Sequence, residues 1–187
     1  MSILNKKVRA LLFADGIWFF GEGMLGPLFA VFAQRVGGDV LDITWAWSVY
    51  LIVYGVMTML IGKLSDNKIK KEWLVAGGFT LNALLTFGYL FVQTSLGLLV
   101  LQFGLGIAAA MATPTWDALY AKYGGAKNRG YLWGLSDGMD PLVTGIAIII
   151  GGLVVNYISF TALFLIMGVI QLISAATIMQ IFTPDKS

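Results

Sequence analysis

We predict an all-α membrane protein with six transmembrane helices, and two observations support this fold class. Hydrophobic residues make up 58% of the 187-residue chain and charged residues only 12%, and the mean hydropathy is +0.84. Such a chain has too little polar surface to cover a soluble globule. It also contains six apolar runs that each reach the roughly 20 residues needed to cross a hydrocarbon core as a helix.

The six predicted helices form one transmembrane domain over residues 1–187. The first apolar run follows three basic residues, as in a secretory signal, but it is longer than a signal sequence and contains Asp15 and Glu22. We therefore expect a retained helix. Very short connections join helices three and four and helices five and six, so these pairs are expected to lie antiparallel. The helices are predicted near residues 8–34, 42–63, 72–92, 95–122, 129–155 and 158–183.

The basic residues predict the orientation in the membrane. Eleven of the twelve fall on one side of the predicted topology, and only Arg35 falls on the other. Cytoplasmic loops carry an excess of Lys and Arg, so both termini are predicted to be cytoplasmic. The expected location is the plasma membrane, which is the inner membrane in a prokaryote. The eleven residues are Lys6, Lys7, Arg9, Lys63, Lys68, Lys70, Lys71, Lys122, Lys127, Arg129 and Lys186.

A short polar turn between the second and third helices carries a recognisable motif. Residues 62–71 read G-K-L-S-D-N-K-I-K-K, which resembles the G-x-x-x-D loop with following basic residues of the major facilitator superfamily. Gly62, Asp66, Lys70 and Lys71 match that pattern in order and spacing. The resemblance implies a role in gating between conformations. An ordinary loop on the positive side of the membrane is the alternative interpretation.

The resemblance extends along nearly the whole chain. In the fourth helix, Gln102 precedes Gly106 by four residues, where the family has an Arg before a Gly. The neutral amide of Gln102 cannot act by charge, although the family's fourth helix implies that it lines a cavity. Members of this superfamily usually have twelve helices in two six-helix halves. The chain is therefore expected to be a half-length protein that pairs with itself, or a fragment of a twelve-helix transporter.

Carboxylates inside the predicted helices are the main candidates for a substrate or ion site. Asp15 and Glu22 are seven residues apart, so they project within about 20° of each other, and Trp18 lies on the same stripe. In the fifth helix, Asp137 and Asp140 are three residues apart and Trp133 extends their face. A bulky aromatic face beside acids suits an organic cation.

These four carboxylates require compensation. Each costs about 2.5–3.5 kcal/mol at the centre of a membrane helix, so four cost on the order of 10 kcal/mol if all face lipid as ions. No Lys or Arg lies at a similar depth in the predicted helices. Protonation, a bound cation or a cationic substrate remain as means of neutralising them. Hydrogen bonding to nearby Ser, Thr, Asn or backbone groups is the structural alternative. Pro141, just after Asp140, is expected to bend the fifth helix.

The resulting hypothesis is a secondary active transporter that is coupled to protons or cations, or that carries a cationic small molecule. It works by rocker-type alternating access as a parallel two-fold homodimer. By the family resemblance, Asp66 of one chain meets the start of helix five of the other, near Arg129 to Tyr131, where the helix dipole favours an acid. A non-transporting membrane scaffold is the alternative from another class.

Other classes fit less well. The chain contains no Cys and no His, and it shows no nucleophile–base pair, metal-ligand cluster or phosphate loop at a credible spacing. We therefore expect no enzyme, no cofactor and no metal site. The net charge is only +2 and the basic residues lie in loops, which argues against nucleic-acid binding. The expected partners are a second copy of the chain, a small-molecule or ion substrate, and the lipid bilayer.

Overall fold

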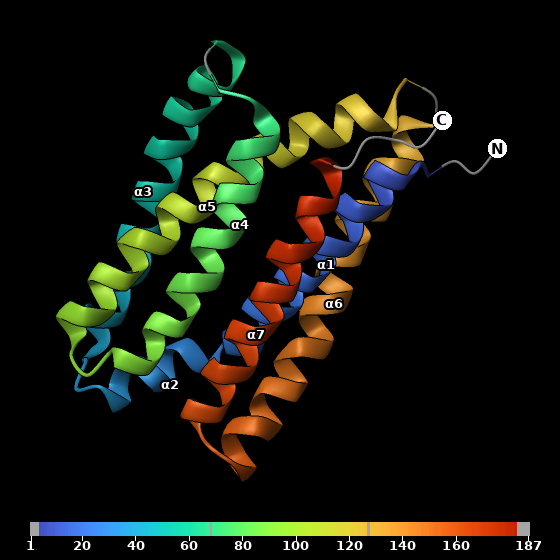
Figure 1. The fold of residues 1–187 in the computed structure, drawn as a ribbon. Helices are drawn as coiled ribbons and strands as arrows, with labels where there is room; N and C mark the ends of the chain where they lie inside the picture. The colour runs from blue at the N-terminus through green and yellow to red at the C-terminus, as the bar shows by residue number, and fades with distance from the viewer. Residues whose placement is uncertain (1–3, 68, 127, 183–187) are drawn as a thin grey trace.

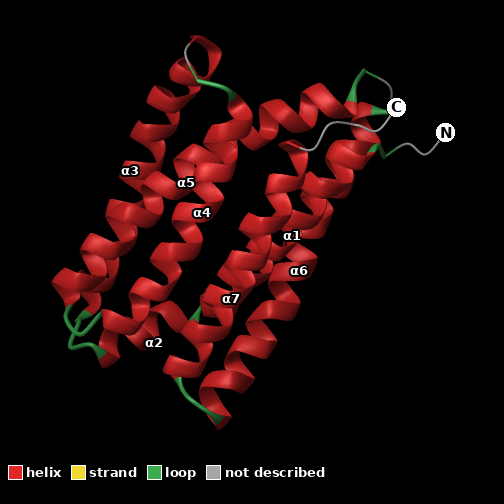
Figure 2. Ribbon diagram, in the orientation of Figure 1, coloured by secondary structure: helices red, strands yellow, loops and turns green. Residues whose placement is uncertain are grey.

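The computed structural model describes residues 4–67, 69–126 and 128–182, and these residues form helices joined by short connections (Figures 1 and 2). The all-α prediction is confirmed. The elements are α1 (Lys6–Leu25), α2 (Leu28–Arg35), α3 (Val40–Asn67), α4 (Lys71–Gly88), α5 (Ser95–Gly124), α6 (Arg129–Tyr157) and α7 (Phe160–Ile178), with 3₁₀ turns over Tyr89–Phe91 and Met179–Phe182.

Five of these helices are long and apolar enough to cross a membrane, and the bent pair α1–α2 makes a sixth when it is counted as one span. The pair bends by 51°, so the predicted first helix over 8–34 is broken. Gly26 adopts φ 20° and Pro27 follows it. A proline lacks the backbone N–H that would continue the helix, so the break falls at this pair.

The connection between α3 and α4 differs from the sequence-based expectation. The polar turn predicted over residues 62–71 is much shorter, because α3 continues through Gly62 to Asn67. Pro141 lies inside α6, which remains one helix from Arg129 to Tyr157, and the expected bend at Pro141 stays a prediction. A proline inside a membrane helix leaves one backbone carbonyl without its helical hydrogen bond, and neighbouring helices or side chains can satisfy that carbonyl.

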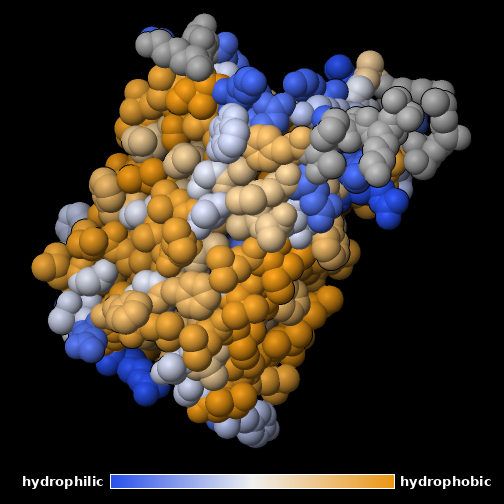
Figure 3. Space-filling model, in the orientation of Figure 1, coloured by the Kyte–Doolittle hydropathy of each residue, from blue (hydrophilic) through white to orange (hydrophobic). Residues whose placement is uncertain are grey.

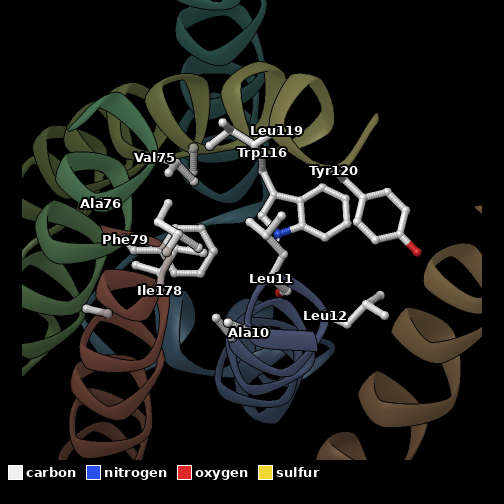
Figure 4. Packing of buried hydrophobic residues seen from close by; sticks show 14 of the residues in the cluster. Ala10, Leu11, Leu12, Val75, Ala76, Phe79, Trp116, Leu119, Tyr120 and Ile178 are labelled. Atoms are coloured by element: carbon white, nitrogen blue, oxygen red, sulfur yellow. Dashed lines mark hydrogen bonds between the residues drawn. The ribbon is translucent and has the colours of Figure 1, made fainter. Parts of the chain in front are cut away.

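The helices pack in the spatial order α3, α5, α4, α7, α1 and α6, each against the next. One apolar cluster joins α1, α4, α5 and α7 near the end of the bundle where α1 begins and α7 ends. Figure 4 shows Leu11 of α1 beneath Trp116 of α5, with Phe79 of α4 beside it. The Trp116 Nε1–H donates to the Leu11 carbonyl at 3.3 Å. This contact links α5 to α1.

The two helices at the ends of that order, α3 and α6, are largely uncovered. In α3 and in α6, only 11% of the residues in an apolar stretch of 18 are buried within the chain. In α4, α5 and α7 the corresponding share is 50%. Figure 3 shows a broad apolar surface with hydrophilic residues gathered toward the ends of the molecule. This distribution matches a bundle that sits across a bilayer.

The α3–α4 and α5–α6 connections, the start of α1 and the end of α7 lie at the same end of the bundle (Figure 1). The described basic residues therefore gather at one end, with Arg35 at the end of α2 as the exception. Lys68, Lys127 and Lys186, which also support the predicted orientation, lie outside the described residues.

Candidate functional site

A pocket with four carboxyl groups lies between α1, α5 and α6, and we call it the acidic pocket. Its volume is about 120 Å³. Asp15 comes from α1, Asp117 from α5, and Asp137 and Asp140 from α6. The rest of the lining is aromatic or small and consists of Trp18, Phe19, Phe79, Ala112, Thr113, Trp116, Trp133 and Ser136. Three of the four predicted acids, and both predicted tryptophans, thus meet in one place.

The carboxylates of the acidic pocket repel one another. If all four are ionised, Asp15 lies near enough to Asp140 and Asp117 to be repelled by them, and Asp137 would repel both Asp117 and Asp140. The Oδ1 atom of Asp140 is buried and has no hydrogen-bond partner among the described residues. No Lys or Arg is found in the described lining. An unpaired carboxylate in an apolar setting is costly, and a proton or a bound cation would lower that cost.

Glu22 lies apart from that cluster and has a different environment. Its Oε1 accepts hydrogen bonds from Asn82 Nδ2 of α4 at 2.9 Å and from Gln171 Nε2 of α7 at 3.3 Å. Gln171 also donates to the Trp18 carbonyl at 3.0 Å. A side chain at Gly21 would place its Cβ 2.6 Å from Gln171 Nε2, so the glycine leaves the room that this amide occupies. Glu22 is therefore hydrogen-bonded by two side-chain amides, which is the structural alternative stated above for the carboxylates.

Glu22 also borders a second cavity of about 320 Å³, which we call the Glu22 pocket. Gln102 of α5 lies in its wall, where Gln102 Oε1 accepts from the Tyr89 hydroxyl at 3.3 Å. The side chain of Gln102 is buried. The full lining is Trp18, Phe19, Glu22, Gly23, Leu25, Gly26, Phe29, Trp47, Tyr50, Tyr89, Gln102, Leu105 and Thr144. The expectation that residue 102 faces a cavity agrees with this position.

The two pockets adjoin, because Trp18 and Phe19 line both of them. The helical stripe predicted for Asp15, Trp18 and Glu22 therefore spans two compartments rather than one. The Trp18 ring lies 4.5 Å from the Phe79 ring. Stacked and tilted aromatic contacts of this kind hold the indole in place between the pockets.

Trp133 is positioned in a similar way on the opposite wall of the acidic pocket. Its ring meets the Tyr120 ring edge-on at 5.2 Å, and Tyr120 stacks on Trp116 at 4.7 Å. The Tyr120 hydroxyl donates to the Leu132 carbonyl at 2.6 Å. These contacts join α5 to α6 and fix an aromatic wall beside the acids.

Asp117 is absent from the set predicted from the sequence. It lies inside the predicted helix over 95–122 and seven residues before the end of α5 at Gly124. That separation corresponds to about 10 Å along the helix, a depth comparable with that of Asp15. The same argument from depth therefore identifies Asp117 once every acid within a predicted span is counted.

The residues of the predicted gating motif lie at the end of α3 and the start of α4. Asp66 Oδ1 forms an ion pair with Lys71 Nζ at 2.8 Å, and the Asp66 side chain is 72% exposed. Lys71 also donates to the Ser65 carbonyl at 3.1 Å. Gly62 lies within α3, and Lys70 is the residue that precedes α4. Asp66 thus has a partner within its own chain.

Arg129 begins α6, and its Nε donates to the Gly125 carbonyl at 3.5 Å. The α3–α4 connection and the start of α6 stand apart at the same end of the bundle (Figure 1). Among the described residues, no ion pair joins Asp66 to Arg129.

Long apolar helices around pockets that contain acids define a multi-pass α-helical membrane protein. The sequence model of the Major Facilitator Superfamily matches residues 11–187. The chain belongs to this superfamily, whose members are membrane transporters and not enzymes. The resemblance inferred from the loop and the fourth helix is confirmed.

Curated relatives agree with this assignment. The chain is 27% identical over 175 residues to the uncharacterized MFS-type transporter MJ1560 of Methanocaldococcus jannaschii. This match covers 94% of the chain and 45% of the relative. It is 24% identical over 179 residues to the multidrug resistance protein MdtG of Klebsiella pneumoniae, covering 93% of this chain and 43% of the relative. The chain spans about half the length of the curated relatives it matches.

Proposed function

We propose that the chain is a secondary active transporter for a cationic small molecule, with proton or cation coupling at the carboxylates within its membrane-spanning helices. The observation that carries this proposal is the acidic pocket, where acids from three helices lie among aromatic rings and no basic residue lines the described wall. Carboxylates attract a cation, and aromatic faces add cation–π attraction. The name multidrug resistance protein of one relative supports a drug-like organic substrate.

The proposal requires a second six-helix bundle. Charged acids on α1 and α6 are tolerated in a membrane when they face a bundle interior or a water-filled path. The uncovered surfaces of α3 and α6, each 11% buried, are the faces that a second bundle would cover. We propose a parallel two-fold homodimer that alternates access by rocking one bundle against the other. The protein would lie in the plasma membrane, which is the inner membrane in a prokaryote, with all termini in the cytoplasm.

Glycines on α6 support this choice of face. An added Cβ at Gly134, Gly138 or Gly145 would meet no atom within 4 Å. In a membrane, small residues allow helices to approach closely. These positions are open within the chain and are suited to contact with another helix.

In this assembly, Asp66 would serve as a gate between the two units. Its ion pair with Lys71 is at a largely exposed site, where such pairs contribute little stability. The carboxylate is therefore available to meet the first turn of α6 in the partner chain, near Arg129, in one of the two transport states. The positive end of the helix dipole favours that contact.

The proposal is tested by reconstituting the chain alone in proteoliposomes and measuring uptake of ethidium, a planar organic cation, under an imposed proton gradient. We expect gradient-driven uptake by the wild-type chain and at least a tenfold loss in Asp140→Asn. Asp39→Asn serves as the control, because Asp39 is an exposed acid before α3. A folded, dimeric chain that neither binds nor moves ethidium would favour the scaffold alternative. A monomeric chain that transports only when a second half is supplied would identify a fragment of a twelve-helix transporter.

A further inference from the structure

A further groove lies outside both central pockets. It has a volume of about 590 Å³ and runs along the first half of α1. Its lining comes from α1, α6, α7 and the last 3₁₀ turn: Leu4, Asn5, Lys6, Arg9, Ala10, Leu12, Phe13, Met139, Thr177 and Gln180. None of these residues lines the acidic pocket or the Glu22 pocket.

This groove faces away from the proposed transport path. Lys6, Arg9, Ala10 and Phe13 follow the i, i+3, i+4, i+7 spacing of one helical face. At 100° per residue, Asp15 lies about 170° around α1 from the centre of that face. Figure 1 shows α1 between α6 and α7 on this side, so these two helices form the walls of the groove.

One end of the groove is basic. Lys6 and Arg9 are exposed, and neither forms an ion pair with a described residue. Lys7, which lies between them in sequence, is instead placed over the Tyr123 ring at 4.9 Å. The polar side chains of Thr177 and Gln180 border the same end. Two cations and two neutral polar groups thus converge where α1 enters the membrane.

The other end of the groove is apolar. Phe13 is 64% exposed and lies about 10 Å further along α1 than Lys6, at 1.5 Å per residue. Met139 of α6 lies against the same stretch and would meet a side chain at Gly16. The groove therefore changes from basic to hydrophobic with depth. Figure 3 shows the same change on the visible surface, with hydrophilic residues at this end of the bundle and apolar residues below.

We propose that this groove binds an anionic phospholipid, with its phosphate at Lys6 and Arg9 and one acyl chain along Phe13 and Met139. The occupant follows from charge complementarity at one end and from hydrophobic contact at the other. Basic pockets between membrane helices on the cytoplasmic side are suited to anionic headgroups. The inference needs only that the chain crosses a membrane, so it is independent of the transport proposal.

The test uses the absence of cysteine from the chain. A single Phe13→Cys variant is labelled with bimane in nanodiscs, and quenching by doxyl-labelled phosphatidylglycerol is compared with quenching by doxyl-labelled phosphatidylcholine. We expect preferential quenching by phosphatidylglycerol. Adding Lys6→Gln and Arg9→Gln should reduce that preference by about 30-fold, which equals about 2 kcal/mol at about 1 kcal/mol per basic residue near an anionic surface.

Two further variants keep the result interpretable. The control Lys63→Gln with Lys122→Gln removes the same net charge from the same end of the bundle and should leave the preference unchanged. Gln180→Glu retains every basic residue that directs insertion, and it should weaken phosphatidylglycerol binding by placing an acid beside the headgroup. Equal quenching by the two lipids, or an equal loss in the control pair, would overturn the proposal. Stronger displacement of the labelled phosphatidylglycerol by inorganic phosphate than by potassium chloride at equal ionic strength would overturn the proposal too. A site for a free anion would then explain the binding.

Discussion

Replacing Glu22 by Gln separates a role in substrate binding from a role in packing. Glu22 Oε1 accepts from Asn82 at 2.9 Å and from Gln171 at 3.3 Å, and the amide oxygen of a glutamine can accept the same two bonds. The substitution therefore removes the charge while it preserves the local hydrogen bonds. We expect the free energy of unfolding to change by less than about 1 kcal/mol, as for a neutral hydrogen bond that is retained.

The effect on substrate binding should be much larger. A hydrogen bond to a charged group contributes about 1.5–3 kcal/mol, which corresponds to about 10- to 150-fold in affinity for a cationic ligand. Ethidium binding to detergent-solubilised Glu22→Gln, measured by fluorescence anisotropy beside a thermal melt of the same sample, gives both quantities. Asn82→Leu is the matched control, since it removes an amide contact and leaves the charge. Unchanged affinity in Glu22→Gln together with a lowered melting temperature would refute the reasoning and assign Glu22 a structural role.

Four further substitutions test the acidic pocket, the two sides of α6 and the connection between α3 and α4. Asp117→Asn should lower ethidium affinity about tenfold or more, as for loss of one charged contact, and unaltered titration curves would remove Asp117 from the site. Gly145→Leu should weaken dimerisation in single-molecule photobleaching without lowering the melting temperature of the monomer, because nothing lies within 4 Å of its added Cβ. Gly151→Leu should instead destabilise the bundle by about 1–3 kcal/mol, as overpacking does, because its added Cβ would collide with the Met24 carbonyl. Equal melting temperatures for Gly145→Leu and Gly151→Leu would contradict this packing. Asp66→Asn should shift the balance between inward- and outward-facing states, and identical accessibility of a reporter cysteine in both forms would count against a gate.

The sequence predicted the transmembrane helices well because hydrocarbon thickness imposes a length on every span. It predicted less at helix ends. The break between α1 and α2 depends on the φ of Gly26, and the extension of α3 to Asn67 depends on a polar helical turn beyond the apolar run. Hydropathy does not encode either feature.

The candidate site was predictable in part. Helical spacing placed Asp15, Asp137 and Asp140 on inward faces, and the structure brings them to one pocket. The separation of Glu22 could not be predicted, because it depends on Asn82 and Gln171, which are 60 and 149 residues away in the chain. Contacts between distant helices are set by packing and are not visible in the periodicity of one helix.

The central claim is that the acidic pocket opens to water within a path enclosed by two bundles. Thr113 lines this pocket and is exposed, and the cysteine-free chain allows Thr113→Cys to serve as a unique reporter. Its reaction with a membrane-impermeant thiol reagent is measured from each side of sealed proteoliposomes, with and without ethidium. We predict labelling from an aqueous side and a slower rate with ethidium bound. A thiol that reacts only with a lipid-soluble maleimide, at a rate unaffected by ethidium, would contradict the account.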